Sequence, residues 1–278
     1  MKIRSMLDND LYKFTMQQAV CQCFPRAQAR YEFINRGGTE FPEGFDVALR
    51  QEIMQMAKLN LTMGQADYLK KMHFMSPVYV DFLKGYRYNP DEVFVQQDGG
   101  DLIVVVEGSW YTTILWEVPL LAVISELYFE MMSDKPFAKD AVKWIVSVRQ
   151  KSMDKAEVFR SCGAKIAEFG TRRRYSGHIQ QAVFEHLLTF CPECVVGTSN
   201  VALAQMHNVR AIGTQAHEWF MFHAAKYGVW MANRTAMENW VDVYRGDLGI
   251  ALTDTFTTDD FFRVFDLKFA KLYDGLRH

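Results

Sequence analysis

The stretch Cys194-Val195-Val196-Gly197-Thr198-Ser199 sets the fold class, because a short apolar run leads into a small polar cluster just before a helical pattern. Similar runs begin at Ile166, Arg210 and Ile250, and three of the four runs lead into Gly-Thr. Strands that alternate with helices are typical of a parallel sheet or barrel, whose chemistry collects at the carboxyl ends of the strands. We therefore expect an α/β region from Lys165 onward.

This α/β region is predicted to hold four strand–helix units. The expected strands are 166–171, 194–199, 210–215 and 250–255. The first helix has an apolar face made of Ile179, Val183, Phe184, Leu187 and Leu188, and the later helices span 201–206, 218–226 and 259–273. Gly275-Leu276-Arg277-His278 indicates the start of another strand. A closed barrel needs about 250 residues, so we expect an incomplete barrel in a fragment or a truncated product.

The first half of the chain predicts an α+β domain. A helix is expected at 9–24, capped by Asp8, and a strand at 29–35. Apolar runs at 93–95 and 102–106 flank Asp98-Gly99-Gly100-Asp101, which indicates a hairpin. Long helices are expected at 115–132 and 140–158. We place the domain change near residue 135, giving an N-terminal α+β domain at 1–135 and a partial α/β barrel domain at 136–278.

Composition excludes several classes of protein. The 278 residues are 49% hydrophobic and 23% charged, which is enough apolar material for a large core and excludes disorder. The 31 basic and 33 acidic residues give no general attraction to nucleic acid. Glu117, Glu126 and Glu130 interrupt the apolar segment 115–132, which argues against a membrane span. Because Asp8 and Asp10 follow the N-terminus where a signal peptide would be apolar, we expect a cytoplasmic protein.

The five cysteines are expected to be reduced thiols, since an odd number in a chain of this length does not suit a disulfide framework. Cys21, Cys23, Cys191 and Cys194 offer an alternative, a four-thiolate zinc site. Only one residue separates the first two thiols, which makes that alternative the weaker one.

Residues that could take part in catalysis or binding lie near the predicted strand ends: Glu168, Ser199, His217, Asp254 and Arg277. A barrel would bring them together. The glycines of Gly-Thr would let a ligand approach the backbone, while the amides and the hydroxyls of Thr198, Ser199 and Thr214 could hold phosphate or ribose oxygens. The alternative is that Gly-Thr only turns the chain and caps a helix.

Asp254 and His217 each have a functional and a structural interpretation. Asp254 ends an apolar strand, where its carboxylate could accept hydrogen bonds from sugar hydroxyls or bind Mg²⁺; alternatively it caps the next helix. His217 begins a predicted helix, whose dipole favours a neutral, nucleophilic imidazole and welcomes an added phosphate. A structural histidine is the alternative.

Basic and aromatic residues complete the candidates. The run Arg172-Arg173-Arg174 is expected at a helix start, where its charge opposes the helix dipole, so a bound anion is the favoured explanation over a solvated surface. Tyr12 and Phe169 could stack on a planar ring, although most such aromatics belong to a core.

Six blocks of the chain, in order and at compatible spacing, resemble bacterial nicotinate phosphoribosyltransferases. They are Asp8-Asn9-Asp10-Leu11-Tyr12-Lys13-Phe14-Thr15-Met16, Phe33-Ile34-Asn35-Arg36-Gly37, Glu168-Phe169-Gly170-Thr171-Arg172-Arg173, Gly197-Thr198-Ser199-Asn200, Gly213-Thr214-Gln215-Ala216-His217-Glu218-Trp219 and Thr253-Asp254-Thr255-Phe256. The resemblance implies a type II phosphoribosyltransferase fold, with an N-terminal α+β domain beside an incomplete, irregular α/β barrel, and a homodimer. The implied reaction joins nicotinate to phosphoribosyl pyrophosphate, in NAD synthesis, with coupled hydrolysis of ATP and with Mg²⁺.

The resemblance also implies roles for individual residues. His217 would be phosphorylated by ATP, and Asp254 would hold ribose hydroxyls or Mg²⁺, with Glu168 as a third residue of the catalytic set. Tyr12 would stack on the pyridine ring from the neighbouring subunit. The remaining substrate-binding residues would be Phe169, from the same subunit, together with Arg172, Thr198, Ser199, Thr214 and Arg277.

Two alternatives remain at this point. A relative that uses nicotinamide or quinolinate would share much of the pattern, and a catalytically impaired remnant could bind a ligand or a partner. In the family, the strand that begins Gly275-Leu276-Arg277-His278 continues into an Asp-Ser-Gly-Asp stretch and further strand–helix units, which this sequence does not contain.

Overall fold

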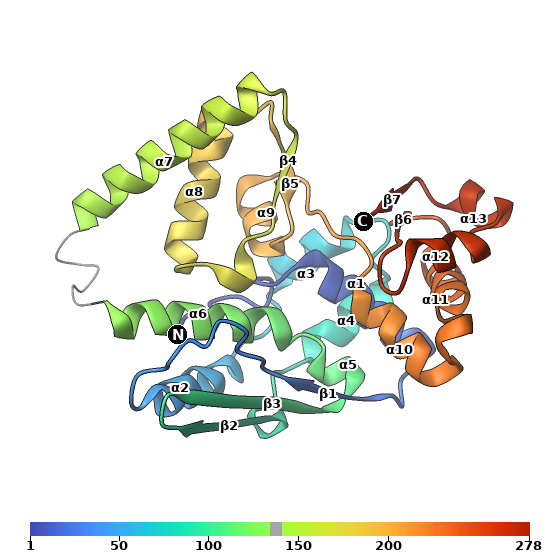
Figure 1. Ribbon diagram of the computed structural model, residues 1–278, viewed down its shortest axis with the longest axis horizontal. Coiled ribbons are helices and arrows are strands. Elements are labelled where there is room, and N and C mark those ends of the chain that lie inside the picture. Colours follow the sequence, from blue (N-terminus) through green and yellow to red (C-terminus); the bar gives the residue numbers. More distant parts are fainter. Residues whose placement is uncertain (134–140) are drawn as a thin grey trace.

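The computed structural model describes residues 1–133 and 141–278 of the chain, and Figure 1 shows their arrangement. The domain change predicted near residue 135 lies outside the described residues. The N-terminal elements form the lower part of Figure 1, and the elements after residue 141 form two groups above and to the right of them.

The N-terminal part contains one antiparallel sheet of three strands in the order β1-β3-β2. Strands β2 (Val93–Asp98) and β3 (Asp101–Ser109) form the predicted hairpin, and Gly99 takes the positive φ of 57° that its turn requires. The strand expected at 29–35 is shorter: β1 spans Gln28–Glu32. Every second residue of β3 faces the core, as Leu102, Val104 and Val106 show.

Helices cover this sheet and build most of the core. They are α1 (Leu11–Cys23), α2 (Phe45–Met56), α3 (Met63–Lys70), α4 (Pro77–Gly85), the 3₁₀ turn η1 (Pro90–Glu92), α5 (Trp110–Thr113) and α6 (Glu117–Met132). The expected cap Asp8 is wrong: α1 begins after Asp10, because Asp8 forms an ion pair with Arg174 instead. By length and composition Trp110–Met132 could cross a membrane, but 61% of its apolar 18-residue window is buried inside the protein, as in a core helix.

The first group after residue 141 contains α7 (Ala141–Ser161), β4 (Ile166–Glu168), the 3₁₀ turn η2 (Thr171–Arg173), α8 (Gly177–Phe190), β5 (Val195–Thr198) and α9 (Val201–His207). Strands β4 and β5 pair in parallel, as predicted. The expectation that Arg172–Arg174 open a helix is wrong, because α8 starts later and Ser176 caps it by accepting from the Ile179 amide.

The second group contains α10 (His217–Tyr227), α11 (Val229–Tyr244), β6 (Ile250–Leu252), α12 (Thr258–Val264), α13 (Leu267–Leu272) and β7 (Gly275–Arg277). Strands β6 and β7 pair in parallel. The strand predicted at 210–215 does not form, because this segment makes only one β-bridge, between Ala211 and Thr198. The helix expected at 259–273 is two helices, because Asp266 caps the second with its side chain.

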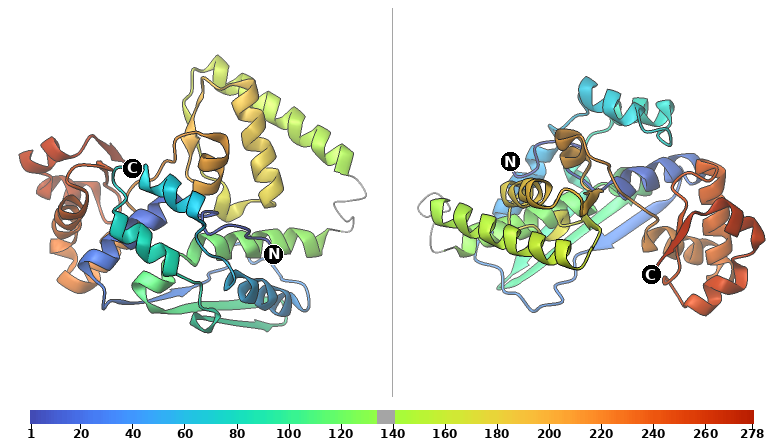
Figure 2. Two further views of the ribbon diagram at one scale, coloured as in Figure 1. Left: turned by 180° about the vertical axis from the view of Figure 1, so that it is seen from behind. Right: turned by 90° about the horizontal axis from the view of Figure 1, so that it is seen from above.

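The described residues contain two separate pairs of parallel strands and no closed barrel, in agreement with the predicted incomplete barrel (Figure 2). One large core cluster runs from the N-terminal helices into α10, α11 and the β6–α13 region. A small second cluster contains Cys191 and Cys194. All five cysteines are free, and no three possible metal ligands gather within the described part of the chain, so the zinc alternative is wrong.

Candidate active site

Helix α1 begins directly against the carboxyl end of β5. The Leu11 amide donates to the Ser199 carbonyl at 2.8 Å, and the Val201 amide donates to the Asn9 carbonyl at 3.0 Å. Tyr12 therefore comes from the first helix of the chain to the same edge as the strand ends. This edge is where the sequence places most of its candidate residues.

Asp10 is a residue of this site to which the sequence assigned no role. Its buried carboxylate accepts a hydrogen bond of 2.7 Å from the Ser199 hydroxyl. Burial raises the pKa of Asp10 to about 6, although Ser199 and the nearby Arg172 act in the opposite direction. Only its place in the Asp-Asn-Asp-Leu-Tyr block could have singled it out, since its partner is 189 residues away.

The Gly-Thr glycines have structural reasons for being small. An added Cβ would lie 2.8 Å from Glu168 Oε1 at Gly170 and 2.8 Å from the Tyr12 nitrogen at Gly213. At Gly197, whose φ is +148°, it would meet the Arg210 carbonyl. Close packing of protein atoms is thus one reason why these residues are glycines, and the approach of a ligand to their backbone stays a prediction.

Glu168 holds the ends of β4 and β5 together. Its carboxylate accepts from the Thr198 hydroxyl at 2.6 Å, from the Gly170 amide at 2.6 Å and from Gln180 Nε2 at 3.0 Å. With these donors already in place, Glu168 stabilises the walls of the site, and Thr198 has donated its hydroxyl hydrogen to it.

His217 and Asp254 form an exposed pair between the start of α10 and the end of β6. His217 Nε2 lies 3.2 Å from Asp254 Oδ1, and the two side chains are 49% and 43% exposed. The alternative in which Asp254 caps a helix is wrong, because Thr257 caps α12. An ionised carboxylate accepts only, so Nε2 would donate to Asp254, and in the neutral ring Nδ1 then keeps its lone pair.

Thr214 and Arg277 meet beside this pair. The Arg277 guanidinium donates to the Thr214 hydroxyl at 2.6 Å, and the Thr253 amide donates to the Arg277 carbonyl at 3.1 Å. The hydroxyl of Thr255, which follows Asp254, is buried and has no hydrogen-bond partner among the described residues. This end of the site therefore offers cationic and hydroxyl groups to an oxygen-rich ligand.

Arg172 lies at the opposite end of the site. Its guanidinium pairs with Glu117 at 3.2 Å, while part of it stays exposed. Tyr12 of the same chain lies close enough to Arg172 to influence its charge. The contribution of Tyr12 from the neighbouring subunit, which the resemblance implies, stays a prediction. Phe169, after β4, is 45% exposed and offers an aromatic surface.

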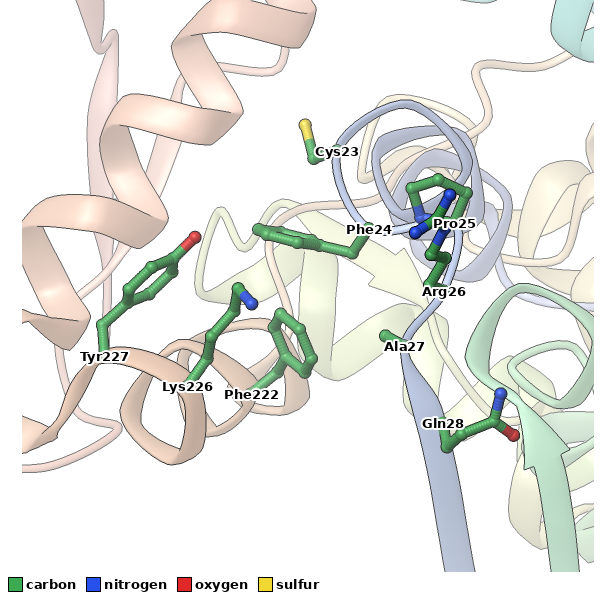
Figure 3. A pocket seen from close by; sticks show the side chains of 9 residues that line it. All are labelled: Cys23, Phe24, Pro25, Arg26, Ala27, Gln28, Phe222, Lys226 and Tyr227. Atoms are coloured by element: carbon green, nitrogen blue, oxygen red, sulfur yellow. The ribbon is translucent and has the colours of Figure 1, made fainter.

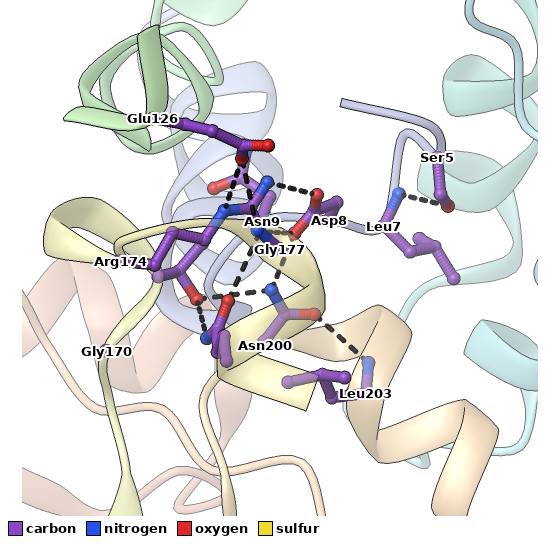
Figure 4. A network of polar contacts seen from close by, with 12 residues as sticks. Ser5, Leu7, Asp8, Asn9, Glu126, Gly170, Arg174, Gly177, Asn200 and Leu203 are labelled. Atoms are coloured by element: carbon purple, nitrogen blue, oxygen red, sulfur yellow. Dashed lines mark hydrogen bonds and ion pairs between the residues drawn. The ribbon is translucent and has the colours of Figure 1, made fainter. Parts of the chain in front are cut away.

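The prediction that Arg172–Arg174 bind an anion is wrong for Arg174. Figure 4 shows this side chain among Asp8, Glu126 and Asn200. Asp8 binds it through both oxygens at 2.8 and 2.9 Å, and Glu126 lies 3.6 Å from its Nε. Protein carboxylates therefore balance the charge of Arg174.

A surface hollow of about 430 Å³ lies between the end of α1 and α10 (Figure 3). Phe24, Phe222, Lys226 and Tyr227 are among its lining residues, and none of the residues predicted for the site lines it. The hollow is distinct from the candidate active site.

The residues near Asp254 could bind Mg²⁺ only together with ligands from a substrate. Within the described ranges no cluster of three metal-binding side chains exists, and Asp254 presents a single half-exposed carboxylate. Mg²⁺ is commonly bound through one or two carboxylates together with substrate phosphates and water. The residues present therefore fit an ion that arrives with phosphate groups, with Asp254 as its protein ligand.

Solved structures with this architecture define the class of the protein. The crystal structure of nicotinate phosphoribosyltransferase from Porphyromonas gingivalis has a TM-score of 0.92 and 44% identity, covering 99% of this chain and 70% of that one. A putative nicotinate phosphoribosyltransferase from Saccharomyces cerevisiae has a TM-score of 0.90 and 31% identity, covering 100% of this chain and 70% of that one. The fold is that of a type II phosphoribosyltransferase.

Sequence comparison identifies the family. Residues 7–125 match the model of the nicotinate phosphoribosyltransferase (NAPRTase) N-terminal domain, and residues 164–278 match that of the NAPRTase family. Nicotinate phosphoribosyltransferase of Chromohalobacter salexigens is 52% identical over 99% of this chain and 69% of the relative, and that of Methanosarcina acetivorans is 42% identical over 99% and 70%. The chain belongs to this enzyme family and spans about 70% of the length of these relatives.

Proposed function

We propose that this protein joins nicotinate to phosphoribosyl pyrophosphate, giving nicotinate mononucleotide and pyrophosphate for NAD synthesis. Family membership supports the two substrates. The observation that carries the proposal is the exposed His217–Asp254 pair, which lies among the strand ends with Thr214 and Arg277 nearby.

His217 is proposed to take a phosphoryl group from ATP. Because Nε2–H faces Asp254, the free lone pair is on Nδ1. Nδ1 attacks the γ-phosphorus, a nitrogen–phosphorus bond forms, the bond to the β–γ bridging oxygen breaks, and ADP leaves. Asp254 stabilises the positive charge of the phosphorylated ring through Nε2–H. Water later cleaves the nitrogen–phosphorus bond and releases phosphate.

Nicotinate is proposed to bind at the Arg172 end of the site. The guanidinium would pair with its carboxylate, and Tyr12 and Phe169 would contact its ring. Arg172 pairs with Glu117 at 3.2 Å and lies near Asp10, and 43% of its side chain stays exposed, so it is accessible to a substrate anion. A pocket that selects by this charge would prefer nicotinate to its uncharged amide.

The ribose and pyrophosphate would lie between these two ends. The ring nitrogen of nicotinate attacks the anomeric carbon as pyrophosphate departs. This transition state has oxocarbenium character, so positioning and electrostatic stabilisation matter more than proton transfer. Arg277, Thr214 and Ser199 would hold phosphate and ribose oxygens, and the unpartnered Thr255 hydroxyl offers a further contact. When bound, Mg²⁺ would neutralise the charge of the departing pyrophosphate.

The protein is further proposed to be a cytoplasmic homodimer. The resemblance of the sequence blocks to the family supports this assembly, and light scattering after gel filtration measures it directly. A monomer at micromolar concentration would contradict the dimer without affecting the assignment of the reaction.

The replacement His217→Ala tests the phosphoryl step. It should abolish ATP hydrolysis and leave weak, ATP-independent formation of nicotinate mononucleotide, because the transfer site itself stays intact. His73→Ala is the matched control, since His73 is an exposed histidine paired with Asp247. Unchanged ATP hydrolysis in the His217 variant would exclude His217, and equal use of nicotinamide would exclude selection by charge.

A further inference from the structure

A fully buried ammonium group joins the two ends of the site. Lys13 follows Tyr12 in α1, and its side chain has no exposed surface. It pairs with Glu117 and, at 2.6 Å, with Glu218. Burial disfavours its charge, but these two carboxylates outweigh that effect and raise the pKa of Lys13 well above its usual range. The ammonium therefore stays charged in the folded protein.

Glu218 is held by three donors from three different elements. Its Oε2 accepts from Lys13 of α1, while its Oε1 accepts from Trp110 Nε1 of α5 at 2.6 Å and from the Tyr31 hydroxyl of β1 at 2.5 Å. Each carboxylate oxygen is thus engaged, and the orientation of this side chain is fixed relative to the N-terminal part of the molecule.

This orientation matters because Glu218 and His217 are the first two residues of α10. The N-cap residue Ala216 makes no side-chain hydrogen bond, so the first turn lacks the usual capping support. Neighbouring residues on a helix point about 100° apart. When Glu218 is anchored toward the core, His217 is turned toward Asp254 and solvent, as observed.

We propose that Glu218 is a positioning residue that holds the first turn of α10, so that His217 meets Asp254 with Nδ1 free to accept phosphate. The phosphoryl step in this inference rests on the proposed function. Lys13 also binds Glu117, which pairs with Arg172 at 3.2 Å. Glu218 acts on the histidine end, while Glu117 acts on the arginine end.

The length of the Glu218 side chain provides the test. Glu218→Asp keeps the charge but cannot reach the same donors. Glu218→Gln keeps the reach and one oxygen that can accept from Trp110 and Tyr31, while its amide NH2 faces Lys13, which keeps its pair with Glu117. Glu238→Asp is the matched control, because Glu238 pairs with Arg234 on the partly exposed surface of α11. For each protein, nitrogen NMR reports the His217 tautomer without ATP, labelled ATP reports phosphorylation of His217, and calorimetry reports nicotinate binding.

Glu218→Asp should mix the His217 tautomers and slow phosphorylation at least tenfold, with nicotinate affinity unchanged within twofold. Glu218→Gln should stay within threefold of the original rate. A single Nε2–H tautomer in Glu218→Asp, or equal losses of phosphorylation and nicotinate binding that follow lost stability, would overturn the inference. If the original protein is not labelled by ATP, the proposed phosphoryl step at His217 is wrong, and the tautomer measurement still decides the role of Glu218.

Discussion

Asp10 has a pKa well above the ordinary value of an aspartate. It is buried, accepts from Ser199, and titrates at about 6 instead of at its ordinary 3.8. A carboxyl group with a raised pKa contributes stability below pH 3.8 and loses it as the pH rises through about 6. At neutral pH the charged form therefore costs about 3 kcal/mol.

Asp10→Asn removes this titration while keeping an oxygen that can accept from Ser199. The free energy of unfolding of the variant minus that of the original protein should be about 2 to 3 kcal/mol larger at pH 7.5 than at pH 4, since each unit of pKa shift corresponds to about 1.4 kcal/mol. Urea unfolding at both pH values measures it. Asp259→Asn, at an exposed position of α12, is the control, and a pH-independent difference for Asp10→Asn would contradict the assignment.

Among the elements, α1 packs closely against the 213–216 loop near the site. A Cβ at Gly213 would lie 2.8 Å from the Tyr12 nitrogen and 3.1 Å from Leu11 Cβ. Gly213→Ala should therefore push the two segments apart and lower the free energy of unfolding by about 1 to 3 kcal/mol. Gly64→Ala in α3, where nothing lies within 4 Å, should be neutral or stabilising. Calorimetric unfolding of both variants measures the difference, and equal stabilities would show that the loop adapts without strain.

The sequence predicted elements well where the pattern is local. The hairpin around Gly99-Gly100, helix α6 and the strands β4 to β7 follow from apolar runs and turn residues. The predictions failed where contacts with residues far away in the sequence determine the local structure. The segment at 210–215 makes a single bridge to β5 in place of the predicted strand, and Asp8 binds Arg174 in place of capping α1. Helix α11 was also not predicted.

The candidate site was predicted in the same uneven way. Local position indicated His217 and Asp254 separately, but their pairing depends on how α10 and β6 pack. The Asp10–Ser199 and Lys13–Glu218 contacts join residues 189 and 205 positions apart, which no spacing rule reveals. The close contacts of Gly197 with Arg210 and of Gly213 with Tyr12 were likewise not predicted, since these neighbours come from other segments.

The neighbouring helices α10 and α11 contain a second group with a strongly shifted pKa. His223 is fully buried, its Nδ1–H donates to the Trp219 carbonyl at 2.7 Å, and its Nε2 accepts from Asn239 at 2.9 Å. Burial lowers the pKa of His223 from 6.5 to about 4. An imidazole with a lowered pKa contributes stability above pH 6.5 and loses it as the pH falls through about 4.

His223→Gln should cost stability at pH 7.5 through lost packing, but the difference from the original protein should shrink by about 3 kcal/mol at pH 4. The exposed His73→Gln serves as the control. Denaturant unfolding at the two pH values provides the measurement. A constant difference would mean that His223 does not become protonated on unfolding.

In the whole molecule, the Asp8–Arg174 pair ties the N-terminal segment to the part of the chain after α7. The Arg174 side chain is 3% exposed and is enclosed by Asp8 and Glu126, while the Asn200 amide donates to the same Asp8 at 2.8 Å. The network in Figure 4 thus connects the residues before α1, helix α6 and the start of α9. These are the elements that set how the strand ends face α1.

Removing one partner of such a buried pair leaves the other charge without compensation. Arg174→Met should therefore lower the free energy of unfolding by about 3 to 5 kcal/mol, and Asp8→Asn should have a smaller but large effect. The double variant should be less destabilised than the sum of the two, because no unpaired charge remains at Asp8. A double-mutant cycle by urea unfolding measures this coupling, with Arg263→Met at an exposed pair as the control. Strict additivity would show that Arg174 contributes through packing alone, and the joining of the two parts would then rest on the shared apolar core.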